Sequence, residues 1–204
     1  MKSFVKPFPL GLLAFFAISI GLYPFVYLII DMSAGLLASK SDALINEPIY
    51  LLGFYTHILG GGLALLIGWA QFFPKLRKKH LKLHQTSGKI YVLAVGASGI
   101  AGLGISFFAT GGLIAASGFF GLALAWLIST WSAYAHIKKK EIDAHQRWMI
   151  RSYALCFAAV TLRIYLPLFT AGFHMDFIPA YQIIAWLCWV PNLAFAEWII
   201  RSYP

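Results

Sequence analysis

The sequence predicts an all-α fold, a polytopic membrane protein built as a bundle of six transmembrane helices. Hydrophobic residues make up 60% of the 204-residue chain and charged residues only 11%, whereas soluble domains are about 45–50% apolar and about 25% charged. The apolar residues form long runs, and the charges gather in the links between them. This pattern is typical of membrane helices joined by loops. It accounts for the net charge of +9 without a nucleic-acid partner, and we expect none.

The apolar runs predict where the helices lie within a single membrane domain, residues 1–204. The first run, residues 8–30, is longer than the apolar core of a signal peptide, which is about 7–15 residues, so we expect a retained helix. The turn at residues 110–112 is so short that the third and fourth helices should form an antiparallel hairpin. Residues 31–48 are mixed and slightly acidic, as expected of a segment outside the membrane. The expected spans are residues 8–30, 49–73, 88–109, 112–136, 145–172 and 180–200.

Basic residues predict the orientation of the bundle. Six spans place both termini on one side of the membrane, and the two links on that side, residues 74–85 and 138–147, are rich in lysine and arginine. Lys2, Lys6 and Arg201 fall on the same side. Cytoplasmic loops are enriched in these residues. We therefore expect the N- and C-termini to be cytoplasmic.

The fifth helix carries the most polar chemistry of the chain. Residues spaced by four or three positions share one face of a helix. On the fifth helix, these are His145, Met149, Ser152, Cys156, Ala159 and Arg163. At 1.5 Å rise per residue, His145 and Arg163 lie about 27 Å apart, close to the hydrocarbon thickness of a bilayer. Two interpretations stay open: a polar seam buried against other helices, or an Arg163 that reaches the headgroups and a His145 that only begins the helix.

Charges inside the apolar runs need partners, because a charge at a helix centre costs about 2.5–3.5 kcal/mol on insertion scales. Glu197, near the cytoplasmic end of the sixth helix, has Arg151 and His145 as candidate partners. We expect Arg163, Ser152, Arg151 and Glu197 to belong to the buried polar seam. The candidate partners of Arg163 at similar depth are His57, Tyr165, Asp176 and Gln182.

The histidines fall into two layers by depth. His84 and His145 begin two helices that enter from the same side, so they are candidate axial ligands of a b-type haem. His57, about two turns inside the second helix, is a candidate for a second haem site or for a quinone site. The alternative is that histidines at helix starts only anchor the helix at the interface. The two cysteines, Cys156 and Cys188, form no CxxC motif, and we assign no metal.

Two motifs resemble a known family. The segments HLKLHQTSGKIYV and HQRWMIRSYALCFAAVTLRIYLP resemble the bacterial membrane proteins grouped as domain of unknown function 2306, over roughly residues 57–167, a core of helices two to five. The family pattern has His-Arg where this chain has His84-Gln85 and His145-Gln146, and threonine in place of Cys156. The resemblance implies a small multi-spanning protein of the bacterial inner membrane, and it implies no activity.

The function classes that remain are a membrane binding or assembly component and a b-type haem redox protein with a bis-His site. A small-molecule transporter is a weaker alternative. No nucleophile, base and acid lie at helical spacing on one level, so we name no catalytic residue and leave enzymatic activity undecided. The expected partners are the lipid bilayer and, as candidates, other membrane proteins or further copies of the chain.

Overall fold

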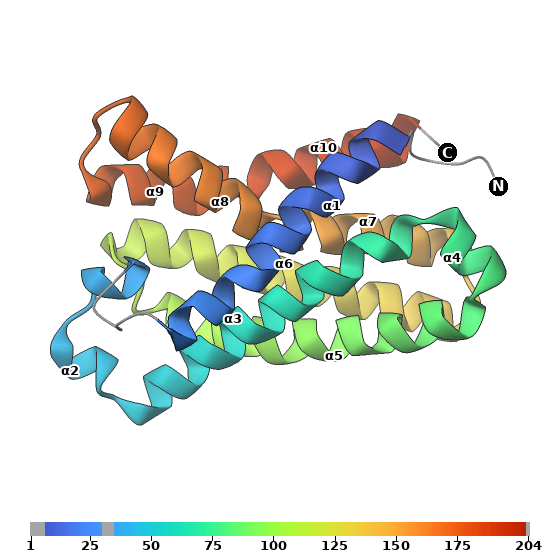
Figure 1. Ribbon diagram of the computed structural model, residues 1–204, viewed down its shortest axis with the longest axis horizontal. Helices are drawn as coiled ribbons and strands as arrows, with labels where there is room; N and C mark the ends of the chain where they lie inside the picture. Colours follow the sequence, from blue (N-terminus) through green and yellow to red (C-terminus); the bar gives the residue numbers. More distant parts are fainter. Residues whose placement is uncertain (1–6, 30–34, 203–204) are drawn as a thin grey trace.

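The structure is a computed structural model that describes residues 7–29 and 35–202. Within these residues it is helical, with no strand. Lys2, Lys6 and Asp31, which the sequence places in the N-terminus and the first loop, lie outside the described residues. The longer helices, drawn in Figure 1, are α1 (Pro7–Leu22), α3 (Pro48–Gly68), α5 (Leu81–Ser106), α6 (Gly112–Lys138), α7 (Ile142–Cys156), α8 (Ala158–Pro167), α9 (Phe177–Leu187) and α10 (Val190–Ser202).

The predicted class, an all-α bundle of six membrane helices, is confirmed. Within the described residues, five helical stretches are long and apolar enough to cross a membrane, and a shorter apolar stretch, Gly11–Tyr27, precedes them. The five stretches are Pro48–Phe72, Leu81–Ser106, Gly112–Lys138, Ile142–Gly172 and Phe177–Ser202. In Figure 1, α1 lies beside α3, and α3, α5 and α6 follow one another as neighbours in the bundle.

The links are shorter and more helical than the sequence suggests. The first basic link contains α4 (Pro74–Lys79), and α5 begins at Leu81, so His84 lies inside a helix. The second link is a tight turn in which Lys140 has a φ of 63°. The hairpin between α5 and α6 turns at Gly111 and Gly112, whose φ values are 106° and 66°, a region that glycine enters at little cost.

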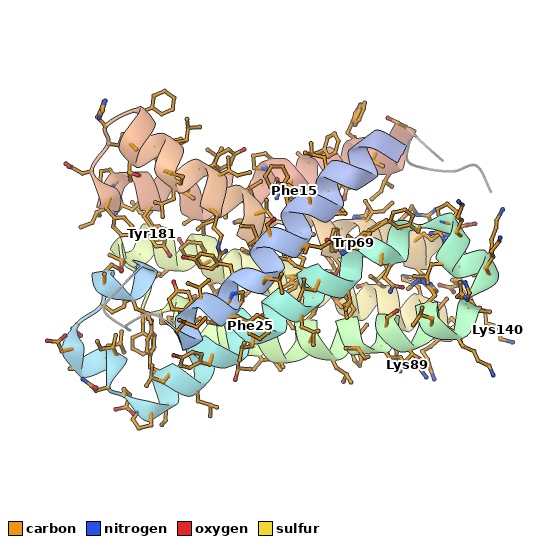
Figure 2. The ribbon with its side chains drawn as sticks, in the orientation of Figure 1. Phe15, Phe25, Trp69, Lys89, Lys140 and Tyr181 are labelled. Carbon is orange, nitrogen blue, oxygen red and sulfur yellow. The ribbon has the colours of Figure 1, made fainter. Side chains whose placement is uncertain are left out.

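The two ends of the bundle differ in character. The basic end comprises α4, the start of α5 and the α6–α7 turn; the opposite end, which we call the α2 end, carries the short helix α2 (Asp42–Ile45). Figure 2 shows Lys89 and Lys140 toward the basic end and Tyr181 toward the α2 end. The 3-10 turns η1 (Tyr23–Leu28) and η2 (Gly35–Ser39) also lie on the α2 side, and η3 (Trp69–Phe72) follows α3.

Two spans are broken where the sequence suggests continuous helices. The fifth stretch is interrupted at Phe157, between α7 and α8, and ends in the π turn η4 (Leu168–Gly172); the sixth is interrupted at Cys188 and Trp189. Backbone carbonyls freed by such breaks need partners in a membrane. Thr161 supplies one, because its hydroxyl donates to the Cys188 carbonyl at 2.5 Å, and Asn192 Nδ2 donates to the Thr161 hydroxyl at 3.2 Å. The two breaks therefore stabilise each other.

Candidate functional site

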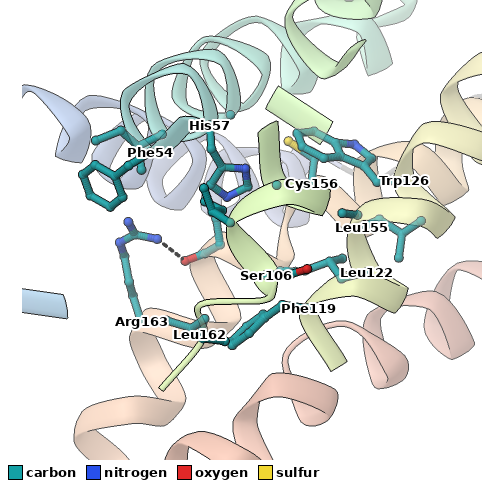
Figure 3. Close-up of a pocket in the computed structure, with 18 of the residues that line it drawn as sticks. Phe54, His57, Ser106, Phe119, Leu122, Trp126, Leu155, Cys156, Leu162 and Arg163 are labelled. Atoms are coloured by element: carbon teal, nitrogen blue, oxygen red, sulfur yellow. Dashed lines mark hydrogen bonds between the residues drawn. The ribbon is translucent and has the colours of Figure 1, made fainter. Parts of the chain in front are cut away.

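A partly open cavity lies between the helices in the half of the bundle nearer the α2 end. Its volume is about 210 Å³, more than the roughly 150 Å³ of an engineered cavity that holds benzene. The walls are mostly apolar and aromatic (Figure 3). Its aromatic lining residues are Tyr50, Phe54, Phe119, Trp126 and Tyr181. The basic side chains that line it are Lys40, His57 and Arg163.

Arg163 lies on α8 with its guanidinium at the edge of this cavity (Figure 3). Its Nη1 donates to the Ala159 carbonyl one turn earlier, at 2.9 Å. The guanidinium carbon lies 4.5 Å from the centre of the Tyr23 ring, a cation–π arrangement. Its Nε is enclosed by protein and has no acceptor in the part of the chain that the structure describes. Among residues 7–29 and 35–202, no carboxylate lies within 4.0 Å of this charge.

His57 faces the cavity from α3. Its Nδ1 lies 2.9 Å from the Ser98 carbonyl, and because a carbonyl only accepts, Nδ1 carries the proton and donates. The Ser98 hydroxyl returns a hydrogen bond to the His57 carbonyl at 2.8 Å. A Cβ at Gly102 would lie only 3.0 Å from His57 Nδ1, so glycine at that position makes room for the ring. With Nδ1 fixed in this way, the imidazole keeps Nε2 as its free acceptor.

Lys40 lies where the cavity meets the loop before α2. Its ammonium donates hydrogen bonds to the Phe108 carbonyl and, at 2.9 Å, to the Thr110 hydroxyl. Ser39 contacts the same hydroxyl at 2.8 Å. These bonds join the loop to the α5–α6 turn. Burial lowers the pKa of the Lys40 ammonium below its ordinary value.

A chain of hydroxyl groups lies beyond the cavity, toward the basic end. Ser152 is fully buried; its hydroxyl lies 2.8 Å from the Tyr91 hydroxyl and 2.6 Å from that of Thr130. Thr130 also donates to the Trp126 carbonyl at 2.8 Å. These contacts join α5, α6 and α7 at one level. On α7, Cys156 follows Ser152 by one turn and lines the cavity.

The predicted haem ligands His84 and His145 lie at the basic end, on α5 and α7. His145 Nδ1 donates to the Ala133 carbonyl of α6 at 2.8 Å, whereas His84 Nδ1 is enclosed without a partner. The two imidazoles are close enough to interact electrostatically. Neither residue lines the cavity described above.

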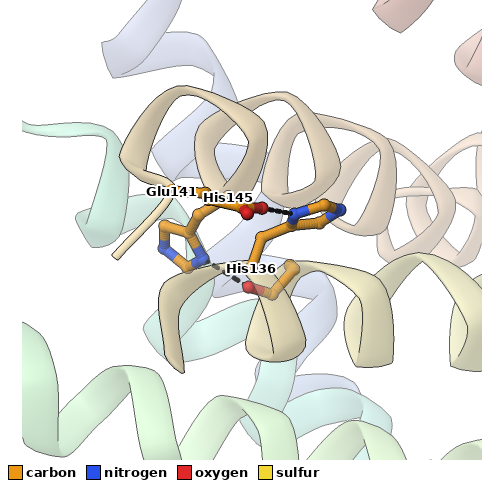
Figure 4. A network of polar contacts seen from close by, with 4 residues as sticks. His136, Glu141 and His145 are labelled. Atoms are coloured by element: carbon orange, nitrogen blue, oxygen red, sulfur yellow. Dashed lines mark hydrogen bonds and ion pairs between the residues drawn. The ribbon is translucent and has the colours of Figure 1, made fainter. Parts of the chain in front are cut away.

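A salt bridge closes the α6–α7 turn beside His145. His136 Nδ1 contacts the Glu141 carboxylate (Figure 4). This hydrogen bond holds the pKa of the Glu141 carboxyl below its ordinary value. In the described part of the chain, no group of three or more histidine, cysteine, aspartate or glutamate side chains is arranged to hold a metal ion.

Arg151 and Glu197 form a bidentate ion pair between α7 and α10. Arg151 Nε and Nη2 donate to the two carboxylate oxygens of Glu197 at 2.5 and 2.9 Å. The guanidinium also lies 4.6 Å from the centre of the Trp148 ring. Of the partners named for Glu197 from the sequence, the structure places Arg151 against it. His145 is turned toward α6 instead.

The candidate seam residues therefore separate into distinct environments. Arg163 lines the cavity, Ser152 belongs to the hydroxyl chain, and Arg151 and Glu197 form the ion pair. Of the partners considered for Arg163, Gln182 instead donates to the Gly111 carbonyl at 2.8 Å.

The sequence alone does not identify Lys40, Trp126, Tyr181 or Thr130 as site residues. The signal in the sequence that fits them is weak, since an aromatic residue near a helix end looks the same whether it faces lipid or a cavity. Only the packing of α6, α8 and α9 distinguishes the two.

Comparison with known families matches residues 54–200 to the family described as "Predicted membrane protein (DUF2306)". The match includes α5 to α9, most of α3 and all but the end of α10, and with them His57, Arg163 and the Arg151–Glu197 pair. No curated protein matches the chain, and no solved structure does. Because the match covers most of the 204 residues, the chain belongs to this family of predicted membrane proteins, as the two motifs indicate.

Proposed function

We propose that the protein is a binding component of the bacterial inner membrane that holds a small molecule in the cavity between α3 and the helices α5 to α9. In this proposal the basic end faces the cytoplasm and the cavity lies in the outer half of the membrane. The observation that carries the proposal is Arg163, a guanidinium that lines the cavity with one backbone acceptor and one enclosed, unpartnered Nε.

The contrast with Arg151 supports a binding role for Arg163. Arg151 is used structurally, because Glu197 neutralises it through two hydrogen bonds. Arg163 lies in the same span without such a carboxylate among the described residues. A charge at membrane depth costs about 2.5–3.5 kcal/mol, and one cation–π contact returns about 0.5–2 kcal/mol. Because the cost of the charge exceeds the gain from the cation–π contact, a further partner for Arg163 is favoured, and the cavity has room for one.

The experiment blocks the cavity without replacing Arg163. Ala159 lines the cavity, so Ala159→Phe fills part of it, whereas Ala97→Phe places the same ring on an exposed face of α5 as the matched control. The melting temperature of each protein in detergent is measured against a panel of neutral, anionic and cationic small amphiphiles. Binding to the native state raises the melting temperature in proportion to RT ln(1 + [L]/Kd). We expect at least one class to stabilise the parent and Ala97→Phe and to have no effect on Ala159→Phe. Equal effects on all three proteins, or none, would contradict the proposal.

A b-type haem held by His84 and His145 is a second candidate. The observation in its favour is that His145 donates Nδ1–H to a backbone carbonyl, which leaves Nε2 free, as in metal-bound histidines. His84 lies within electrostatic reach of it and has an unpartnered Nδ1. The test is an absorption spectrum of protein produced with haem supplied, oxidised and then reduced with dithionite. Sharp reduced bands that disappear in His84→Leu and in His145→Leu would support it, and a colourless protein would end it.

A further inference from the structure

We infer that the cavity selects a small aromatic acid, whose anionic group pairs with Arg163 and whose hydrogen-bond donor reaches His57. This inference rests on the proposed function and names the chemical class of its ligand. It draws on the charge of the cavity, the free atoms of its polar side chains and the nature of its walls.

The charge of the cavity favours an anion. Among the described residues, those that line it include two cationic side chains, Lys40 and Arg163, and no aspartate or glutamate. Lys40 already has two hydrogen-bond acceptors from the protein, so it contributes mainly its positive potential. The guanidinium of Arg163 is held in place by Ala159 and Tyr23. A fixed guanidinium with unused N–H groups is suited to a carboxylate, which can accept two parallel hydrogen bonds.

His57 supplies a second, opposite kind of contact. Its Nδ1–H is engaged by the Ser98 carbonyl, so the available ring nitrogen is an acceptor. An acceptor on the cavity wall is matched by a hydroxyl or N–H group of the ligand. Figure 3 shows His57 and Arg163 on the cavity wall from α3 and α8. A molecule with an acid at one position and a donor at another would satisfy both side chains.

The walls and the volume indicate a ring. Tyr50, Phe54, Phe119 and Trp126 present aromatic surface to the cavity, and aromatic groups pack on one another in offset or edge-to-face arrangements. A volume of about 210 Å³ exceeds the roughly 150 Å³ that accommodates benzene. It therefore has room for one ring with a carboxylate and a hydroxyl, and little more.

The experiment compares probes that differ by one group. Dissociation constants are measured by equilibrium dialysis in detergent at neutral pH, with empty micelles as the blank, for benzoate, its neutral methyl ester, benzylamine, and 3- and 4-hydroxybenzoate. In the parent we expect benzoate to bind more tightly than methyl benzoate, and methyl benzoate more tightly than benzylamine. Arg163→Gln should weaken benzoate about tenfold or more, the scale of a charge-assisted hydrogen bond, and should leave methyl benzoate unchanged. Ala97→Phe, on the exposed face of α5, should bind as the parent does.

The comparison of benzoate with the two hydroxybenzoates tests the role of His57. At least one hydroxybenzoate should bind the parent about 2- to 10-fold more tightly than benzoate, the scale of one neutral hydrogen bond, and the advantage should vanish in His57→Leu. An advantage that persists in His57→Leu would overturn the role of His57.

The two proposals fail differently. If methyl benzoate or benzylamine binds the parent but not Ala159→Phe, and benzoate binds no better than its ester, the cavity binds ligands and the acid inference is overturned. If no probe distinguishes the parent from Ala159→Phe, the proposed function falls as well. Should Arg163→Gln not fold, the order of the three probes in the parent alone decides the question of charge.

Discussion

Replacing Ser152 by alanine tests whether the buried hydroxyl chain couples α5, α6 and α7. Ser152 bonds both Tyr91, at 2.8 Å, and Thr130, at 2.6 Å. Thr130 keeps its bond to the Trp126 carbonyl in the variant, so the Tyr91 hydroxyl is the group left without its partner. Tyr91 is fully buried, and an orphaned buried hydroxyl costs about 1–3 kcal/mol.

The size of this destabilisation also depends on how much a hydrogen bond between membrane helices contributes. Interhelical hydrogen bonds in a membrane protein contribute about 0.6 kcal/mol on average and about 1.7 kcal/mol at most in double-mutant cycles. We therefore expect Ser152→Ala to lower the free energy of unfolding by about 1–2 kcal/mol. Tyr91→Phe removes the group that Ser152→Ala would orphan. In the Tyr91→Phe background, Ser152→Ala should lower the free energy of unfolding by less than it does in the parent, and the difference should be at least about 0.6 kcal/mol.

The assay is reversible unfolding in mixed micelles by titration with a denaturing detergent, followed by circular dichroism. The four proteins of the cycle are the parent, Ser152→Ala, Tyr91→Phe and the double variant. Cys156→Ala, one turn along the same helix and without a hydroxyl, controls for loss of packing. A coupling energy near zero would refute the reasoning, since the hydroxyl groups would then contribute independently.

Two further predictions concern charges, and a third concerns the topology. Arg163→Leu should leave the free energy of unfolding unchanged or raise it while abolishing benzoate binding, because the charge has no carboxylate partner among the described residues; a loss of several kcal/mol would show that it is paired within the chain. The hydrogen bond to His136 lowers the pKa of the Glu141 carboxyl. The contribution of this carboxylate to stability is therefore present above the unfolded-state pKa and should be lost as the pH falls through the folded-state pKa. The free energies of unfolding of the parent and of Glu141→Gln, measured in detergent at a series of pH values, should differ only above that range. Single cysteines at Lys139 and Asn46 should label from opposite faces of intact cells, and labelling from one face would contradict the six-span topology.

Much of the fold is predictable because the bilayer imposes simple rules. Apolar runs of about 20 residues have few alternatives to a membrane helix, and the short turn around Gly111 could only join neighbouring antiparallel helices. The break of the fifth span at Phe157 was not predicted. Its cause lies in another helix, since Thr161 bonds the carbonyl of Cys188. Pro191 does mark the second break in the sequence, because proline has no backbone N–H to donate and is tolerated in the first turn of a helix, here α10.

The candidate site was only partly predictable. Helical spacing correctly groups Cys156, Ala159 and Arg163, which line one cavity, because that periodicity is local. The partners of these residues are not local. His57 bonds Ser98, 41 positions along the chain, and the guanidinium of Arg163 lies over Tyr23. Such contacts depend on how the helices cross, which the hydrophobic pattern of one chain does not specify.

The most direct test of the binding claim identifies what the protein carries. The parent, Ala97→Phe and Ala159→Phe are purified in parallel, washed free of loosely held lipid and denatured, and the released small molecules are quantified by mass spectrometry. We expect an organic acid to be released in near-stoichiometric amounts from the parent and from Ala97→Phe, and to be depleted in Ala159→Phe, the variant with the filled cavity. The same released molecules in equal amounts from all three proteins, or no such acid from any, would contradict it.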